Sequence, residues 1–216
     1  MIIKVCGMRE MENIKGLLKE PSPDWMGLIF YPASPRYVKN ANLPPTFYAD
    51  LDVEKVGVFV NEDLHSIQRI VKDYGLDKVQ LHGDEPPDLS RMLKETLVIE
   101  VIKVFRIGKE WMWEKAEPYV EHIDWLLFDT ATPQFGGSGH RFDWGVIHTY
   151  PFAKPFLLSG GIGEEHKEAV LELARKLPKM KGIDINSKFE QAPGLKELEK
   201  VKSFIEYIRS SAKSEA

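Results

Sequence analysis

Short apolar stretches alternate with segments of helical periodicity from one end of the chain to the other. The stretch KVGVFV at residues 55–60 is apolar at most positions, which is typical of a strand buried on both faces. The next segment places Leu64, Ile67 and Val71 on one helical face and ends before Gly75, a candidate C-terminal cap. The pattern predicts eight strands, at residues 2–6, 25–30, 55–60, 78–81, 97–105, 125–128, 156–158 and 182–185. It predicts helices at residues 11–19, 43–50, 63–74, 87–95, 109–120, 144–148, 164–177 and 195–210.

This alternation of strands and helices along the whole chain favours one α/β architecture, a (β/α)₈ TIM barrel with parallel strands. A doubly wound open sheet is the alternative, but no Gly-x-Gly-x-x-Gly motif follows the first strand. No linker, repeat or low-complexity segment divides the chain. We therefore expect residues 1–216 to form a single catalytic domain, with frayed residues from about 211 to 216.

Composition and charge narrow the range of partners. The net charge of −4 includes no basic excess, so we expect neither a nucleic-acid partner nor an anionic membrane partner. No apolar run approaches the roughly 18 residues that span a bilayer. Cys6 is the single cysteine, which excludes an internal disulfide and fits a reducing compartment. The first residues, MIIKVCGM, are strand-like rather than signal-like, so we expect a cytoplasmic protein.

Polar and reactive residues follow almost every predicted strand. In TIM barrels the chemistry lies at the C-terminal ends of the strands, so these residues are the first candidates for a site. Polar strand ends are common in any barrel, and the pattern alone therefore favours an active site only modestly. The residues are Cys6, Arg36 a little further along, Asn61, His82, Arg106, Asp129, Ser159 to Gly161, and Asn186 with Ser187.

Cys6 and Asp129 are the candidates for proton transfer, and each has a plain structural alternative. A lone cysteine is usually a small buried apolar residue. A thiol whose pKa is lowered toward neutral pH can instead carry a proton or act as a nucleophile. An aspartate at a strand end often serves only as a loop acceptor. Partial burial can instead raise its pKa and make it an acid or base.

Two glycine-rich segments favour a phosphate site. The sequence GGSG occupies residues 136–139, and Ser159-Gly160-Gly161 follows the seventh predicted strand. Glycines let backbone N–H groups converge on an anion, and barrels often bind phosphate after their last strands. The long connection 130–143 favours a functional loop, and its alternative is a surface excursion.

Arg36 and His82 are candidates for ligand contacts. Arg36 stands between Pro35 and Tyr37, and a guanidinium on a proline-stiffened loop suits bidentate carboxylate binding, although most arginines face solvent. His82 either contacts a ligand or hydrogen-bonds neighbouring loops. The run HGDE at residues 82–85 has no second histidine at a ligand spacing, so we predict no metal site.

Several motifs together resemble those of the phosphoribosylanthranilate isomerase family. KVCGM, SPRYV, QLHG, LLFDT, GGSG, LLSGGI and GIDINSK come in the family's order and cover nearly the whole chain. The resemblance implies a (β/α)₈ barrel, a step of tryptophan synthesis and no cofactor. The implied reaction is the Amadori rearrangement of N-(5-phosphoribosyl)anthranilate to 1-(2-carboxyphenylamino)-1-deoxyribulose 5-phosphate.

The resemblance also assigns roles to residues of this chain. It makes Cys6 the general base, Asp129 the general acid and Arg36 the partner of the anthranilate carboxylate. His82 and Arg106 become further substrate-binding residues. The implied phosphate site is formed by Gly139, Gly160, Gly161, Asn186 and Ser187. The implied partner is a small phosphorylated substrate, and the family includes both monomers and homodimers.

The chain departs from the family pattern at two positions. His140 stands where the family often has lysine, and the adjacent Arg141 could substitute for that charge. The eighth strand is followed by Asn186-Ser187-Lys188 rather than Ser-Ser-Gly. Lys188 cannot relax backbone strain as glycine does, which affects the expected geometry of the backbone donors.

Other functions fit parts of the same pattern. A metal-dependent sugar-phosphate epimerase would need a cluster of His and Asp ligands, for which only His82 and Asp129 are candidates. Indole-glycerol-phosphate synthase relies on strand-end lysines, which most of these strands lack. The alternatives without catalysis are a phosphate-binding barrel and a redox sensor that uses Cys6.

Overall fold

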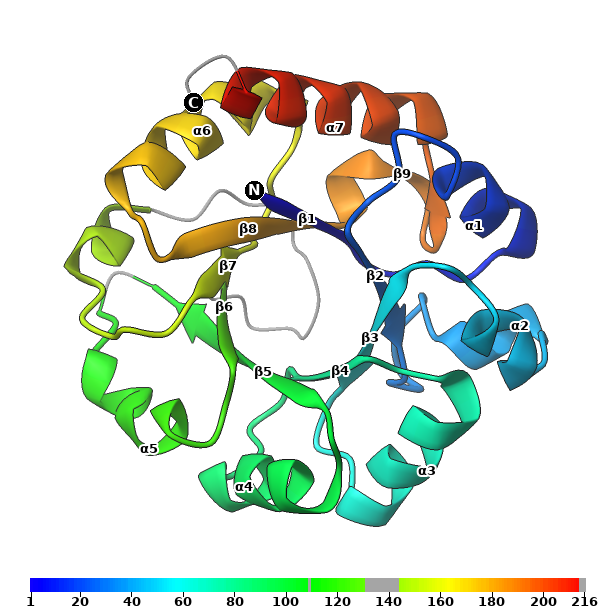
Figure 1. Cartoon of the computed structure of the whole chain (residues 1–216), viewed down its shortest axis with the longest axis horizontal. Coiled ribbons are helices and arrows are strands. Elements are labelled where there is room, and N and C mark those ends of the chain that lie inside the picture. The colour runs from blue at the N-terminus through cyan, green and yellow to red at the C-terminus, as the bar shows by residue number, and fades with distance from the viewer. Residues whose placement is uncertain (109, 131–143, 214–216) are drawn as a thin grey trace.

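Eight parallel strands form a closed barrel, which confirms the predicted (β/α)₈ architecture. The structure is a computed structural model that describes residues 1–108, 110–130 and 144–213. The strands, which surround the centre of Figure 1, are β1 (Ile2–Val5), β2 (Trp25–Ile29), β3 (Glu54–Phe59), β4 (Lys78–Leu81), β5 (Glu100–Ile107), β6 (Trp125–Thr130), β7 (Phe156–Leu158) and β8 (Met180–Ile185). The barrel closes where β1 pairs with β8, with Lys4 opposite Asp184.

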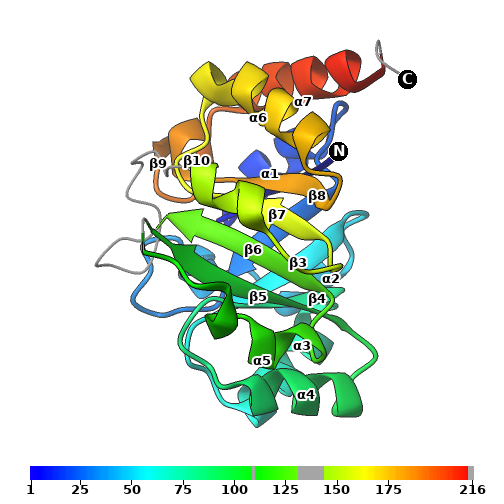
Figure 2. The ribbon, with the colours of Figure 1, turned by 90° about the vertical axis from the view of Figure 1, so that its left-hand side faces the viewer.

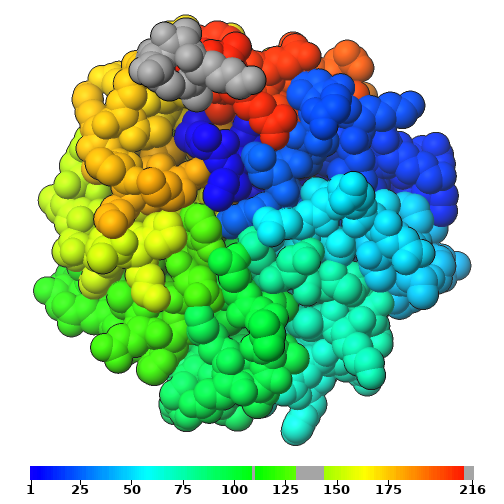
Figure 3. Space-filling view, viewed as in Figure 1, coloured from blue at the N-terminus to red at the C-terminus, as the bar shows by residue number. Residues whose placement is uncertain are grey.

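Helices surround the barrel in chain order. The α-helices are α1 (Met11–Leu17), α2 (Pro45–Ala49), α3 (Leu64–Tyr74), α4 (Pro87–Thr96), α5 (Glu117–Val120), α6 (Lys167–Lys176) and α7 (Leu198–Lys213). Short 3-10 helices occur at η1 (Val38–Ala41), η2 (Trp113–Lys115), η3 (Trp144–Thr149), η4 (Glu164–His166) and η5 (Ser187–Phe189). In Figure 3 the colours follow one another around the molecule, and the red C-terminal helix lies beside the blue N-terminal segment. No helix of the described residues is long and apolar enough to cross a membrane.

Local signals explain the ends of the best-predicted helix. Asp63 precedes α3, and its side chain accepts a hydrogen bond from the Ser66 N–H at 3.0 Å. This bond satisfies one of the N–H groups that a helix leaves unpaired at its start. Gly75 ends the helix with a φ of 58°, a left-handed conformation that glycine adopts without steric cost.

The barrel has a separate small core inside the strands. Its buried members come from alternate positions of the strands and are Trp25, Val56, Ile102, Val104, Leu127 and Leu157. The rings of Trp25 and Trp125 pack edge-on with centroids 5.1 Å apart. A much larger apolar cluster fills the space between the strands and the helices. Further along β1, β4 and β8, the buried polar side chains of Lys4, Gln80 and Asp184 replace this apolar filling.

Two predicted elements were wrong in part. Residues 110–112 are not helical, and the segment predicted as helix 109–120 forms only η2 and α5, because Trp111 and Trp113 pack against Phe105 and Phe128 instead of extending a helix. The strand predicted at 97–105 is β5, which begins at Glu100 and ends at Ile107. The short helix predicted at 144–148 is present as the 3-10 helix η3.

The C-terminal part of the chain differs as well. The prediction that the last helix begins at residue 195 was wrong, because Leu195 and Lys196 form strand β10 (Leu195–Lys196), which pairs with β9 (Glu190–Ala192) in an antiparallel hairpin. The helix α7 starts at Leu198 and continues to Lys213, beyond the predicted end at residue 210.

The barrel interior yields the first testable prediction. Trp25→Ala should reduce the free energy of unfolding by about 3–5 kcal/mol, because it empties a large part of the small interior core. Val98→Ala is the control, since Val98 is fully exposed and should change stability by no more than about 0.5 kcal/mol. Urea unfolding followed by fluorescence measures both. A loss below about 1 kcal/mol for Trp25→Ala would contradict its central place in the interior core.

Candidate active site

A cavity of about 270 Å³ lies at the C-terminal ends of the barrel strands. In Figure 2 the arrowhead of β6 points toward this end, where the β9–β10 hairpin also lies. Of the predicted site residues that the structure describes, all except Asn61 and Arg106 line this cavity: Cys6, Arg36, His82, Asp129, Ser159, Gly160, Gly161, Asn186 and Ser187. Gly139, His140 and Arg141 lie outside the described residues.

Cys6 follows β1 directly and is 4% exposed. Its N–H donates to the Ile185 carbonyl at 2.9 Å, which continues the pairing of β1 with β8. The neighbouring strand contributes Gly27, where an added Cβ would lie 2.8 Å from the Cys6 Sγ and 3.0 Å from its Cα. Gly27 therefore makes room for the thiol, a role that the sequence analysis did not assign.

A buried ion pair lies next to this thiol. Lys4 Nζ is 2.9 Å from Asp184 Oδ2, and the two side chains are 0% and 6% exposed. Lys4 also interacts electrostatically with Cys6. Neither residue was predicted as part of the site, although a lysine and an aspartate inside the apolar strands IIKV and GIDI indicate buried charges.

The ion pair and the burial act on Cys6 in opposite senses. Burial raises the pKa of the Cys6 thiol, because the thiolate loses its hydration. The positive charge of Lys4 offsets part of this increase in pKa, while the negative charge of Asp184 adds to it. Burial by itself would lower the pKa of Lys4, but Asp184 and Cys6 outweigh it and hold that pKa above its usual value. The lysine thus stays charged and remains able to stabilise a thiolate.

The Asp129 side chain faces His82, which directly follows β4. Asp129 Oδ2 lies 3.4 Å from His82 Nε2, and the Gln80 amide nitrogen lies 3.2 Å from His82 Nδ1. Gln80 is fully buried, and its amide fixes the orientation of the imidazole. An amide that donates to Nδ1 leaves the ring proton on Nε2, the atom that faces the Asp129 carboxylate.

The loop after β7 exposes its backbone to the cavity. Gly160 and Gly161 have φ values of 92° and 68°, in the left-handed region that other residues rarely adopt. Ser159 anchors the loop, because its N–H donates to the Phe128 carbonyl at 2.8 Å. The loop therefore presents backbone without bulky side chains to a ligand.

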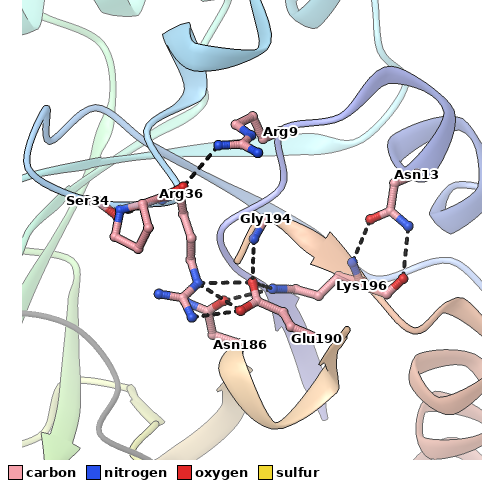
Figure 4. Close-up of polar contacts among 9 residues, drawn as sticks. Arg9, Asn13, Ser34, Arg36, Asn186, Glu190, Gly194 and Lys196 are labelled. Carbon is pink, nitrogen blue, oxygen red and sulfur yellow. Dashed lines mark hydrogen bonds and ion pairs between the residues drawn. The ribbon is translucent and has the colours of Figure 1, made fainter. Parts of the chain in front are cut away.

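Arg36 reaches the cavity from the loop after β2. Its guanidinium binds the Glu190 carboxylate at 2.7 to 3.0 Å, as Figure 4 shows. Gly7, with a φ of 75°, packs against both Arg36 and Asn186, since an added Cβ would lie 2.8 Å from an atom of each. The sequence analysis identified Arg36 but neither Glu190 nor this use of Gly7.

Arg106 lies elsewhere. It contacts Asp84 and lines a neighbouring cavity of about 230 Å³ together with Lys103, Trp111 and Tyr119. The described residues therefore do not bring Arg106 into the cavity that holds Cys6 and Asp129, although Arg106 and Asp129 are partners in the β5–β6 register. Among the residues that the structure describes, no group of three or more His, Cys, Asp or Glu side chains could hold a metal ion.

The surroundings of Cys6 predict a titration. Because burial raises the pKa of Cys6, its thiolate should form at higher pH than that of N-acetylcysteine amide measured alongside. Lys4→Met should raise the midpoint further. The effect of Lys4 on Cys6 is larger than that of Asp184, so the direction holds even if Asp184 takes up a proton. The ultraviolet absorbance of the thiolate reports this directly, since the chain has one cysteine.

Lys103→Met is the control for this titration. Lys103 is another buried lysine in an ion pair, 2.7 Å from Glu85, but it lines the other cavity. Its removal should leave the Cys6 midpoint unchanged. An unchanged or lower midpoint in Lys4→Met would contradict the stabilising role of Lys4.

Comparisons with known proteins agree with this geometry. Residues 3–207 match the family model described as N-(5'-phosphoribosyl)anthranilate isomerase. A relative of that name from Parabacteroides distasonis is 42% identical over 210 residues, which cover 96% of this chain and 93% of the relative. One from Thermotoga maritima is 35% identical and covers 94% of this chain and 96% of its own length.

Solved structures give the same result. A crystal structure of phosphoribosyl anthranilate isomerase from Thermotoga maritima superposes with a TM-score of 0.81 at 34% identity, covering 97% of this chain and 100% of its own. Another, solved in complex with reduced 1-(o-carboxyphenylamino)-1-deoxyribulose 5-phosphate, has a TM-score of 0.78 at 32% identity and the same coverage. The length and the sequence identity of these matches show that the chain belongs to the N-(5'-phosphoribosyl)anthranilate isomerase family.

Proposed function

We propose that this chain catalyses the Amadori rearrangement of N-(5-phosphoribosyl)anthranilate in tryptophan biosynthesis, with Asp129 as general acid and Cys6 as general base. The observation that carries the proposal is that both groups line a single cavity, together with a cation and a glycine loop. Each end of the substrate would then have a matching partner. Membership of the isomerase family favours this function over the epimerase and synthase alternatives.

The reaction begins with opening of the furanose ring. Asp129 donates a proton to the ring oxygen, the bond between that oxygen and C1′ breaks, and the anthranilate nitrogen forms a double bond to C1′. His82 faces the Asp129 carboxylate at 3.4 Å and can stabilise the charge that remains there. Gln80 supports this step by fixing the orientation of the imidazole.

The second step removes the proton from C2′. The Cys6 thiolate takes this proton, and the electrons of the C–H bond move toward the nitrogen to give an enolamine. The product ketone forms when C1′ gains a proton and the 2′-hydroxyl loses one. Because burial raises the pKa of Cys6, its thiolate is less abundant but a stronger base, and Lys4 limits the loss of abundance.

The remaining contacts orient the substrate. Arg36 binds the anthranilate carboxylate, and the backbone around Gly160, Gly161 and Ser187 binds the phosphate. The crystal structure of a relative in complex with reduced 1-(o-carboxyphenylamino)-1-deoxyribulose 5-phosphate supports this class of ligand. One Thermotoga maritima relative is described as dimeric, and for this chain both the oligomeric state and the cytoplasmic location stay predictions.

The proposal predicts the activity of two variants. Cys6→Ser and Asp129→Asn should each reduce kcat by about 10²–10⁴-fold, the usual contribution of a positioned acid or base. Freshly generated phosphoribosylanthranilate is the substrate, and the loss of its fluorescence measures turnover.

Asp124→Asn is the matched control for Asp129→Asn. Asp124 precedes β6, at the opposite end of the strand, where it binds the Val101 N–H. Its variant should lose stability and keep kcat. If the wild-type protein only matched uncatalysed decay, the proposed function would be wrong. Full activity in either Cys6→Ser or Asp129→Asn would remove that residue from its role.

A further inference from the structure

We propose that Glu190 is a positioning residue that aims Arg36 at the carboxylate of the substrate, held in place by the β9–β10 hairpin and Lys196. The inference rests on the proposed function, because it assumes that Arg36 binds the anthranilate carboxylate. It adds a specificity-determining cluster, defined as Arg36, Glu190 and Lys196, that lies beside the reacting groups and takes no part in proton transfer.

Glu190 is bound from three directions (Figure 4). Its carboxylate accepts from Arg36 Nε at 2.9 Å and from Arg36 Nη2 at 2.7 Å. It also accepts from Lys196 Nζ at 2.6 Å and from the Gly194 N–H at 3.1 Å. The Glu190 side chain is only 4% exposed. A carboxylate with this many charge-assisted bonds has one orientation, which it imposes on the arginine.

The pairing uses one edge of the Arg36 guanidinium. Glu190 takes the Nε and Nη2 edge, while Nη1 has no hydrogen-bond partner within the described part of the chain. Arg36 also lines the cavity. A guanidinium is planar with five N–H donors, so fixing one edge fixes the direction of the other. The Nη1 and Nη2 edge is thus preorganised for a second carboxylate.

Glu190 is itself held by elements far apart in the sequence. The hairpin reaches α1, because Asn13 exchanges two hydrogen bonds, at 2.9 and 2.8 Å, with the backbone of Lys196. Lys196 Nζ also binds Asn186 Oδ1 at 2.7 Å, at the end of β8. The hairpin therefore ties the Arg36 loop to both the helix layer and the barrel rim.

The charges of the cluster favour one more carboxylate. Arg36 and Lys196 are cations and Glu190 is a single anion, and their side chains are 13%, 0% and 4% exposed. Hydrogen bonds from Arg36 and Lys196 outweigh burial and hold the pKa of Glu190 below its usual value, so the carboxylate is ionised. Burial lowers the pKa of Lys196, and the Glu190 carboxylate offsets part of that decrease. With Lys196 protonated, the cluster carries a net charge of +1 in a poorly hydrated place, which a monoanion such as a benzoate carboxylate would neutralise.

A different role for Glu190 makes the opposite prediction. If Glu190 only competed with the ligand for Arg36, its neutralisation would make the cluster more positive and would strengthen carboxylate binding. If Glu190 aims Arg36, the same change releases the guanidinium and weakens that binding. The sign of the effect therefore separates positioning from simple charge attraction.

The test measures the binding of two probes by calorimetry. One is the reduced product analogue, reduced 1-(o-carboxyphenylamino)-1-deoxyribulose 5-phosphate, and the other is its counterpart without the ring carboxylate. Glu190→Gln should weaken binding of the first probe by roughly tenfold and leave the second unchanged. Glu190→Asp, which keeps the charge on a shorter side chain, should lie between wild type and Glu190→Gln.

A double-mutant cycle shows whether Glu190 acts through Arg36. The Kd of the double variant Arg36→Met/Glu190→Gln for the carboxylated probe should equal that of Arg36→Met alone. Glu85→Gln is the matched control, because Glu85 is equally buried and pairs with Lys103 at 2.7 Å beside the other cavity. It should lower the melting temperature without changing the preference for the carboxylated probe.

Three results would overturn the inference: tighter or equal binding of the carboxylated probe by Glu190→Gln, equal weakening of both probes, or full additivity with Arg36→Met. If Glu190→Gln does not fold, Glu190→Asp decides by the same comparison. Failure of the proposed function is distinguishable, since wild-type protein would then neither turn over phosphoribosylanthranilate nor bind the reduced analogue.

Discussion

The pairing of β1 with β8 closes the barrel, and the site depends on it. This register places Lys4 opposite Asp184, and the strand direction then carries Cys6 and Asn186 to the same rim. The price of burying two charges is high unless they are paired with good geometry, and here they are 2.9 Å apart. A slip of one residue in either strand would turn that strand's side chain away from the interior and break the pair. The ion pair therefore forms only when the barrel closes in this register, and it also sets the electrostatic environment of the thiol.

Close packing around the thiol is the second constraint. The absence of a side chain at Gly27 leaves space for the Cys6 sulfur. The absence of one at Gly7 lets the side chains of Arg36 and Asn186 approach the backbone directly after Cys6. Both contacts would be shorter than real Cβ contacts if alanine stood there. The cavity is thus formed as much by missing side chains as by the polar groups that line it.

The sequence predicts the barrel well because strand and helix periodicities are local, and parallel strands bring their C-terminal ends to one rim. Cys6, His82 and Asp129 could be found on that basis. The partner of Arg36 could not, because Glu190 lies 154 positions away and its hairpin looks like the start of a helix. Arg106 shows the limit of the strand-end rule, since it follows that rule and yet lines a neighbouring cavity.

The choice of a thiol as base fits the charges already present in the cavity. Asp129 and Asp184 both line it, and a carboxylate in place of Cys6 would put a further negative charge beside Asp184, which already acts on the thiol. Because burial raises the pKa of the thiol, its thiolate is a strong base for the C2′ proton. The positive charge of Lys4 stabilises that thiolate until the proton transfer neutralises it. Lys196 of the Arg36 cluster also acts on the thiol, because its positive charge lowers the pKa of Cys6, so the carboxylate site and the base share one electrostatic environment.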